Sequence, residues 1–528
     1  MFRQKRDMNS YFKNNVFSIS FGTTASKLVG FAREAFIAAA FGIGITYDAF
    51  NFAYIIPGFF LIIIGGINGA YHNAVVAVIS PLNKKDSGVL LTQVGIKLTS
   101  ILILLGLFIY LNASFLINLI GPNLSIEAKS IATLQLRILT PCIPLSGFIG
   151  LSYGALNSRN KFFISSISPA IISLTTILFI SLNWTLNKDT NFIPYSALLA
   201  SATLAGTIIQ FFIQIWSINK IGLLRFKCNW YSFIKEEKRV FNLIFPASIS
   251  SGLGQINVYV DMFFASSFQG AASGLAYGNF LIQAPLGILS NSLILPLLTS
   301  FSKLKAKKKF VEFRNKLILG IECCFLITIF LTAFFITFNN QIVQLAFQRG
   351  AFDYEAVGNV RKILIAYSVG IPFYLYRDLL VRTYYAIEKT KLPFQLSLLG
   401  IFLNIFFDWF LIGAPTQNIG NLSPYNFEIE GIILSSAVVN LIICFILSIN
   451  LRNNHIPIPF VVLFGKILLI SGSALFSSLI CFSIFQNIPL LTSDIERLLV
   501  LIFESLTFFI IYFLITKFLK VNKFSFYK

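Results

Sequence analysis

The sequence predicts an all-α polytopic membrane protein with fourteen transmembrane helices. Of the 528 residues, 56% are hydrophobic and only 12% are charged, about half the charged share of roughly 25% in soluble domains. A single hydrophobic core stops growing at about 250–300 residues, so no soluble domain needs this much apolar surface. The apolar runs are about twenty residues long, which excludes an outer-membrane barrel, whose strands alternate polar and apolar residues.

Fourteen apolar segments are long enough to cross a bilayer as helices, which takes about 20 residues. The first follows a basic N-terminal stretch, is too long for the core of a signal peptide and has no evident cleavage site. We therefore expect it to remain as a membrane helix. The predicted spans lie near residues 14–41, 49–80, 87–112, 127–157, 162–182, 194–217, 240–266, 271–301, 317–338, 355–387, 391–413, 429–450, 457–484 and 495–517.

Lysine and arginine are distributed unevenly between the loops. With a cytoplasmic N-terminus, the segments on that side hold 28 of these residues, whereas the outer loops hold two, Lys188 and Arg349. Positive residues collect on the cytoplasmic side of membrane proteins. We therefore expect a multi-pass protein of the plasma (inner) membrane with cytoplasmic ends at 1–13 and 518–528. The same loops explain the net charge of +20, and we expect no nucleic-acid partner.

Two segments of the chain have a second, similar copy further on. The string AAAFGIGITYDAFNFAYIIPGF is similar to ASSFQGAASGLAYGNFLIQAPLG, and Pro57 and Pro285 fall at matching places. The string ALNSRNKFF at 155–163 is similar to AIEKTKLPF at 386–394. Six predicted helices separate the copies, so the repeats run parallel, as in secondary transporters that bind their substrate between two halves.

The repeats predict two parallel six-helix lobes followed by two additional helices. The N-lobe is expected at 14–217, and a cytoplasmic linker at 218–239 leads to the C-lobe at 240–450. The two C-terminal helices occupy 457–517.

Several charged residues lie inside predicted spans, where each costs about 2.5–3.5 kcal/mol on insertion scales and is read as functional. Lys27 and Arg33 are about 9 Å apart along the first helix. They could form a basic cavity wall for an anion, most simply a phosphate. The alternative is an internal salt bridge of Arg33 with Glu34 or Asp48. Other charged residues inside spans that could line a cavity are Arg137, Arg377, Asp378 and Arg382.

A second polar group is predicted from depth in the membrane. Asp261 and Asp408 each lie five residues before the outer end of a span, and Ser436 lies seven residues after an outer start. All three are therefore about 8–10 Å below the outer surface. Asn404 shares a helix face with Asp408. These oxygens suit a small cation or a proton, and the alternative is a set of unrelated interhelical hydrogen bonds.

Proline and glycine punctuate the early helices of each half. Pro57 and Pro285 interrupt backbone hydrogen bonds, and Gly65 and Gly66 allow bending or close packing, so these four are candidate hinges.

The six cysteines include no CxxC pair, and two histidines cannot form a metal cluster. We expect no disulfide, no metal beyond the cation site, and no cofactor.

The residues around the first two helices resemble a known family. The string SKLVGFAREAFIAAAFG, followed by YDAF, is similar to the start of the MurJ (MviN) family of lipid II flippases, in the same superfamily as MATE exporters. The strings QINVYVD, YYAIEKTKLP and LNIFFD are similar to further family motifs. The resemblance, with the fourteen spans, covers the whole chain.

The resemblance implies a role for each candidate residue. The family flips the peptidoglycan precursor lipid II by alternating access of a cavity between two lobes. Arg33 would contact the diphosphate, with Lys27, Glu34 and Asp48 beside it. A sodium-like site would use Asp261, Asn404, Asp408, Ser436 and the Ile432 carbonyl. The groove for the polyprenyl tail would lie at the two C-terminal helices.

The chain also departs from the family pattern. Family members commonly have arginines in helices 2 and 8, whereas here helix 2 has none and Phe280 stands at the helix 8 position. A flippase for another polyprenyl-diphosphate-linked oligosaccharide is therefore an alternative.

Two other function classes differ in the chemistry they need. A cation-coupled exporter of small amphipathic compounds would use the carboxylates without a basic wall. A membrane glycosyl- or acyltransferase would need clustered acidic or His residues, which the longest outer loop, GAPTQNIGNLSPYNFEIE, does not hold. We expect a monomeric transporter of a lipid-linked sugar in the membrane, and not an enzyme.

Overall fold

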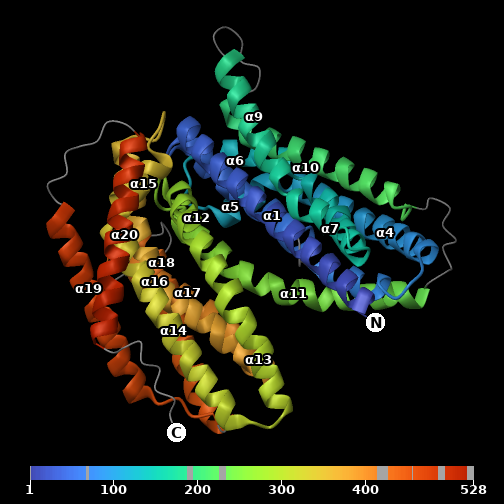
Figure 1. Ribbon diagram of the computed structural model, residues 1–528. Coiled ribbons are helices and arrows are strands. Elements are labelled where there is room, and N and C mark those ends of the chain that lie inside the picture. The colour runs from blue at the N-terminus through green and yellow to red at the C-terminus, as the bar shows by residue number, and fades with distance from the viewer. Residues whose placement is uncertain are drawn as a thin grey trace. The chain divides into compact units, whose positions relative to one another are not determined.

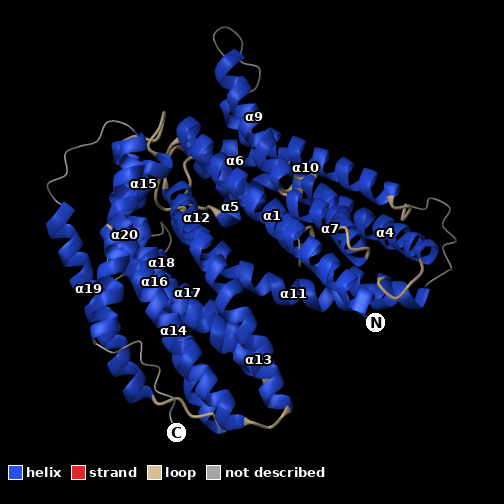
Figure 2. Cartoon of the chain, viewed as in Figure 1, coloured by secondary structure: helices blue, strands red, loops and turns tan. Residues whose placement is uncertain are grey.

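The computed structural model describes residues 2–66, 70–186, 194–224, 234–412, 426–454, 456–485 and 494–519. In this part of the chain the regular structure is entirely helical (Figure 2). The chain divides into two compact units. Unit 1 contains residues 1–272 and 349–351, and unit 2 contains the remainder.

Figure 1 shows the helices in chain order. Their bounds are α1 Phe2–Phe41, α2 Ile45–Phe59, η1 Phe60–Ile64, α3 Ala70–Ile79, α4 Lys84–Leu111, α5 Ala113–Ile120, α6 Ile126–Leu139, α7 Cys142–Ser158, α8 Phe162–Ile167, α9 Ala170–Leu186, α10 Tyr195–Lys220, α11 Ile234–Ala265, α12 Ala271–Leu289, η2 Ser290–Ile294, α13 Leu295–Ala306, α14 Phe310–Thr337, α15 Asn339–Phe347, α16 Tyr354–Ala386, α17 Lys391–Ile412, α18 Glu428–Asn450, η3 Leu451–Asn454, α19 Phe460–Phe485 and α20 Asp494–Phe518.

The all-helical membrane fold is confirmed. Among the described residues, ten helical stretches are long and apolar enough to span a membrane, and the bent pair α6–α7 raises this to eleven. The other three predicted spans coincide with α1, with α8 and α9, and with α11. The count of fourteen therefore remains a prediction, although every predicted span falls on helix. The segment 1–13, expected as a tail, is helical from Phe2 onward.

Unit 1 is held by small residues at helix crossings. The helix α7 packs against α3, α4 and α10, and its glycines allow this close approach. A Cβ at Gly150 would lie 2.2 Å from the Ile64 carbonyl oxygen, and one at Gly154 would lie 2.6 Å from the Val75 Cβ. Small residues at such crossings let two backbones approach closely.

The predicted hinge in unit 1 is a turn of π-helix. Pro57 lies inside α2, and the five residues of η1 follow it before Gly65. A Cβ at Gly66 would lie 2.0 Å from the Ile62 carbonyl oxygen, so only glycine fits. Proline removes a helical hydrogen bond, and single π-turns inside α-helices often mark functional sites. Whether the turn bends in use remains a prediction.

The helix α11 belongs to unit 1 by its contacts, whereas the sequence placed its span in the C-lobe. It packs against α3 and α4, and Lys97 of α4 forms a 2.6 Å ion pair with Glu237 of α11. The physical reason is the polar N-terminal part of α11, which finds its charge partner on α4. The unit boundary at Ala272 accordingly lies beyond the predicted linker.

A short return segment closes one end of unit 1. Residues 349–351 pack against the end of α1, where the Ala351 N–H donates to the Ala39 carbonyl at 2.8 Å. A Cβ at Gly42 would lie 2.3 Å from the Ala351 oxygen, and a Cβ at Gly350 would lie 2.3 Å from the Ala39 oxygen. Both glycines have positive φ, so the two backbones touch with no room for a side chain.

Unit 2 is built around α16. This helix packs against α14, α15 and α18, and α17 packs on the other side of α18. The stretch α12–η2–α13 repeats the plan of α2–η1, because Pro285 lies inside α12 and a π-turn follows at 290–294. The π-turn contacts α16.

The two C-terminal helices, α19 and α20, pack against each other and against α14 (Figure 1). Lys466 of α19 and Glu322 of α14 form a 2.6 Å ion pair, and both side chains are largely buried. The Tyr512 hydroxyl of α20 donates to the Leu326 carbonyl at 2.8 Å. These contacts attach the C-terminal pair specifically to α14.

The predicted internal repeat is visible in the backbone. Gly42 and Gly270 both have positive φ, and so do Asn160 and Glu388. Each pair is 228 positions apart, the same offset as Pro57 and Pro285. At Asn160 the N–H of Lys161 bonds the Leu156 carbonyl, and at Glu388 the corresponding bond joins positions 389 and 384. The two halves therefore share helix-ending turns as well as sequence.

Candidate functional site

The charged residues of α1 form a buried pair. Arg33 donates to Glu34, and the Tyr47 hydroxyl from α2 donates to the other Glu34 carboxylate oxygen at 3.2 Å. The Glu34 side chain is 8% exposed, whereas the Arg33 side chain is 32% exposed. The predicted salt-bridge alternative between Arg33 and Glu34 is therefore present, and it leaves the guanidinium open to a further ligand.

Asp48 and Lys27, which were predicted beside Arg33, and Arg137, which was predicted as an additional cavity residue, lie in different surroundings. Asp48 is buried at the start of α2 and accepts a hydrogen bond from the Gly270 N–H. Its side chain therefore links the start of α2 to the residue before α12. Lys27 is exposed on α1. Arg137 is exposed on α6, with its guanidinium 5.8 Å from the ring centroid of Tyr110.

Part of the predicted cation site is assembled in unit 2. The Asn404 side-chain amide donates to Asp408 at 3.0 Å, and the Ser436 hydroxyl donates to the Asn404 side-chain oxygen Oδ1 at 3.2 Å. Asp408 is fully buried. The neighbouring Ser435, which sequence reasoning missed, also donates to Asn404 at 3.2 Å. The adjacent serines on α18 were the available signal.

Asp261 and Ile432 complete the predicted cation set. Ile432 is buried on α18, four residues before Ser436. Asp261 is half-buried on α11 and belongs to unit 1. The carboxylate, amide and hydroxyl oxygens of unit 2 fit a small hard cation by their chemistry.

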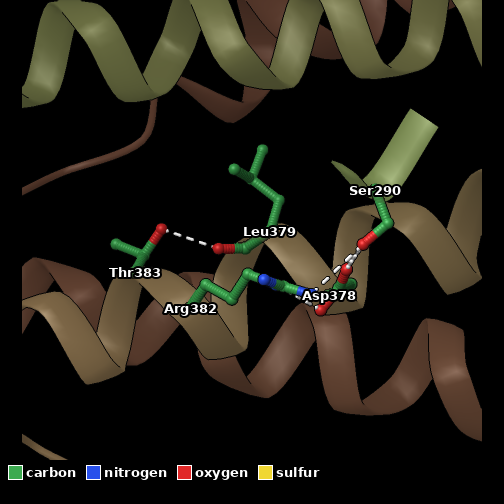
Figure 3. Close-up of polar contacts among 5 residues, drawn as sticks. All are labelled: Ser290, Asp378, Leu379, Arg382 and Thr383. Atoms are coloured by element: carbon green, nitrogen blue, oxygen red, sulfur yellow. Dashed lines mark hydrogen bonds and ion pairs between the residues drawn. The ribbon is translucent and has the colours of Figure 1, made fainter. Parts of the chain in front are cut away.

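A second charged cluster lies on α16 and was only partly predicted (Figure 3). The Arg382 Nε donates to Asp378 at 2.8 Å, and the Ser290 hydroxyl of η2 donates to the other Asp378 oxygen at 2.7 Å. Arg382 also reaches Ser290 at 3.2 Å. Sequence reasoning found the charges but missed Ser290, because nothing in the sequence fixes where the π-turn begins.

Arg377 lies on the same helix and has a neutral partner. Its Nη1 donates to the Asn440 carbonyl oxygen of α18 at 2.8 Å. Asn440 was also missed in the sequence, although an asparagine in an apolar span is a signal for an interhelical hydrogen bond.

Unit 2 also contains an apolar pocket of about 650 Å³. It is lined by residues of α12, α14 and α20, among them Leu289, Phe330 and Tyr512. The sequence placed a tail groove at the two C-terminal helices, and α20 does contribute, whereas α19 supplies none of the lining residues. An apolar pocket of this kind accepts a hydrocarbon chain.

Charged pairs inside apolar helices, a buried carboxylate with hard oxygen neighbours and an apolar pocket define a multi-pass membrane transporter. The family model described as lipid II flippase MurJ matches residues 37–509, which is most of the chain. The chain belongs to the MurJ family of lipid II flippases.

Individual relatives agree with the family model. A probable lipid II flippase MurJ of Synechocystis sp. is 38% identical over 407 residues, covering 76% of both chains. One of Rhizobium meliloti is 27% identical over 388 residues, covering 72% of both chains.

Solved structures show the same fold. A lipid II flippase MurJ in an inward closed conformation matches with a TM-score of 0.76 at 25% identity, covering 96% of this chain and 99% of that chain. An inward-facing MATE family transporter of the MOP superfamily matches with a TM-score of 0.59 at 13% identity, covering 82% and 96%. The second likeness shows the fold alone.

Proposed function

We propose that the protein moves lipid II, the lipid-linked peptidoglycan precursor, from the inner to the outer leaflet of the plasma membrane for cell-wall synthesis. Family membership supports the substrate. The observation that carries the proposal in this chain is Arg33, a guanidinium on α1 that is held by a buried carboxylate and is still one-third exposed. No covalent bond changes in this transport, and the protein acts as a monomer.

Arg33 binds the diphosphate of the head group. Glu34 holds one end of the guanidinium, and Tyr47 in turn holds Glu34, so the charged group is already ordered before a ligand binds. Arginine suits phosphate because its planar fork makes two parallel hydrogen bonds. Lys27 supplies a weaker attraction because it is exposed and its charge is screened by water.

The polyprenyl tail occupies the apolar pocket of unit 2. Its volume of about 650 Å³ holds part of a prenyl chain, and its lining is aliphatic and aromatic. The remainder of the tail stays in the lipid bilayer, which is equally apolar. The tail site therefore selects for a long hydrocarbon chain and not for a particular sugar.

A cation or proton resets the transporter. Asp408 is a fully buried carboxylate on an apolar helix, and a buried charge is stable only with a counter-charge or a proton. Within unit 2, sodium would be held by Asp408 with the Ser436 hydroxyl and the Ile432 carbonyl. Both chain termini lie in the cytoplasm, in accordance with the loop charges.

The test is head-group transport in vesicles that contain the purified protein and lipid II. We expect Arg33→Ala to abolish transport, and Arg361→Ala, an exposed arginine of α16, to leave it unchanged. Transport by Arg33→Ala at the wild-type rate would contradict the proposal. If wild type moves only other polyprenyl-diphosphate-linked sugars, the alternative substrate is correct.

The coupling ion is tested in the same vesicles with Asp408→Asn. We expect this variant to lose the response to a sodium gradient or a pH gradient while it still binds lipid II. Glu355→Gln, which changes an exposed acid at the start of α16, is the matched control. An unchanged gradient response in Asp408→Asn would overturn the coupling role.

A further inference from the structure

One face of α16 carries three charges inside an apolar span. Arg377, Asp378 and Arg382 are all partly exposed, and the span Tyr354–Ala386 is otherwise apolar enough to cross a membrane. Arg377 lies nine residues before the end of the helix, which is about 14 Å of helical rise. A charge at that depth needs a partner or water.

The charges on this face do not balance in the described part of the chain. Asp378 is bonded to Arg382 and Ser290. Arg377 is bonded to Asn440, which is neutral. Two guanidinium groups therefore stand against one carboxylate, which pairs with Arg382 alone, and the net charge of the three residues is positive. Such a face attracts an anion because the surrounding apolar helices screen its charge poorly.

Arg382 points deeper into the span. A long basic side chain near a helix end normally extends toward the membrane surface. Arg382 lies four residues before the end of α16, yet its guanidinium turns back to Asp378 and across to Ser290 of the π-turn (Figure 3). The π-turn thus supplies a hydroxyl that holds the guanidinium inside the span.

The polar cluster adjoins the apolar pocket along the chain. Leu289 lines the pocket, and the next residue, Ser290, bonds Asp378 and Arg382. The same short stretch therefore contacts a charged cluster and a hydrocarbon site. A ligand that fits both has an anionic head and an apolar tail.

We propose that Arg377, Arg382 and Ser290 form a second site for the diphosphate of a polyprenyl-diphosphate lipid, within unit 2. This inference rests on the proposed function and adds a second binding site for the transported lipid. When no lipid is bound, Asp378 accepts a hydrogen bond from the Arg382 guanidinium. The diphosphate displaces the Asp378 carboxylate because it binds the same guanidinium.

Asp378 promotes release of the lipid from this site. A carboxylate and a phosphate compete for the same N–H groups, so the carboxylate returns as the lipid leaves. Removal of its charge should therefore strengthen binding and slow release. If the Asp378–Arg382 ion pair were purely structural, removal of the Asp378 charge would weaken binding and speed release, because it would only destabilise the helix.

The experiment measures binding of a radiolabelled polyprenyl diphosphate to the full chain in nanodiscs. We use the Arg33→Gln background so that the remaining binding reports unit 2. We expect Arg382→Gln and Arg377→Gln to weaken this binding at least tenfold, and Arg361→Gln to leave it unchanged. Asp378→Asn should tighten it severalfold and slow dissociation. The polyprenyl monophosphate should bind more weakly than the diphosphate.

The outcomes separate the two proposals. If the otherwise wild-type chain binds no polyprenyl diphosphate, the proposed function fails. If it binds and Arg33→Gln removes all binding, or if the α16 variants bind as their background does, only the second site fails. Should Arg382→Gln unfold, Arg382→Lys decides, because it keeps the charge but loses the two-pronged contact. An unchanged affinity in Arg382→Lys and faster dissociation in Asp378→Asn would overturn the proposal.

Discussion

The stretches α2–η1 in unit 1 and α12–η2 in unit 2 share a backbone plan and differ in their partners. Each has a proline inside an α-helix and a five-residue π-turn soon after it. In unit 1 the turn packs against the backbone of α7, where Gly150 admits the Ile64 carbonyl. In unit 2 the turn offers Ser290 to the charges of α16.

The difference shows that one backbone irregularity serves two purposes. A π-turn exposes backbone and shifts side chains around the helix. Unit 1 uses it for tight packing between helices, because its side chains are apolar there. Unit 2 uses it to place a hydroxyl beside a charged pair. A perturbation of the first turn should therefore cost folding stability, whereas a perturbation of the second should cost ligand binding.

The preceding helices differ in charge at corresponding positions. Arg33 of α1 and Asp261 of α11 are 228 positions apart, the offset of Pro57 and Pro285. The first half of the repeat therefore has a basic side chain at the position where the second half has an acidic one. This contrast agrees with the proposed anion site on α1.

The largest effect is expected from Glu34→Gln. This change removes a buried carboxylate that accepts hydrogen bonds from both Arg33 and Tyr47, and bonds to charged groups contribute about 1.5–3 kcal/mol each. Thermal unfolding in detergent should therefore occur at a clearly lower temperature. Glu355→Gln, at an exposed site, should unfold like wild type. Equal unfolding of the two variants would contradict the buried pair.

The Gly150→Ala variant tests whether the π-turn of unit 1 serves packing. The added Cβ would lie 2.2 Å from the Ile64 carbonyl oxygen, and such overpacking costs about 1–3 kcal/mol. Gly358→Ala is the control, because a Cβ there meets nothing within 4 Å. The control should be neutral or slightly more stable in thermal unfolding, since alanine favours helix by about 1 kcal/mol.

The companion change in unit 2 is Ser290→Ala. It removes a hydrogen bond to the Asp378 carboxylate, and bonds to charged groups contribute about 1.5–3 kcal/mol locally. We expect a smaller loss of stability than for Gly150→Ala, because the cluster is partly exposed. Polyprenyl-diphosphate binding should fall several-fold. Normal binding with a large loss of stability would show that both turns serve packing alone.

The smallest effect is expected from Lys27→Ala. Lys27 is exposed, so salt screens its attraction for an anion. Transport should fall no more than a few-fold at low salt and stay near wild type at high salt. A loss as large as that of Arg33→Ala at both salt concentrations would place Lys27 in direct contact with the head group.

The sequence predicted the helices well because each span is a long apolar run, and every predicted span coincides with helix. It could not predict the π-turns, since proline marks a break without fixing the turn that follows. It predicted that Asn404, Asp408 and Ser436 lie together, because depth and helix face are periodic. It missed Ser290 and Asn440, because interhelical partners depend on packing angles that single helices do not encode.

The close approach at Gly42 and Gly350 has a consequence for how the protein can change. A methyl group at Gly42 would meet the backbone carbonyl of Ala351, and one at Gly350 would meet that of Ala39. An alanine at either position has no compensating partner, because every residue has the backbone carbonyl that it would meet. Suppressor mutations for such a variant should therefore map away from the contact, to residues that move one whole segment relative to the other.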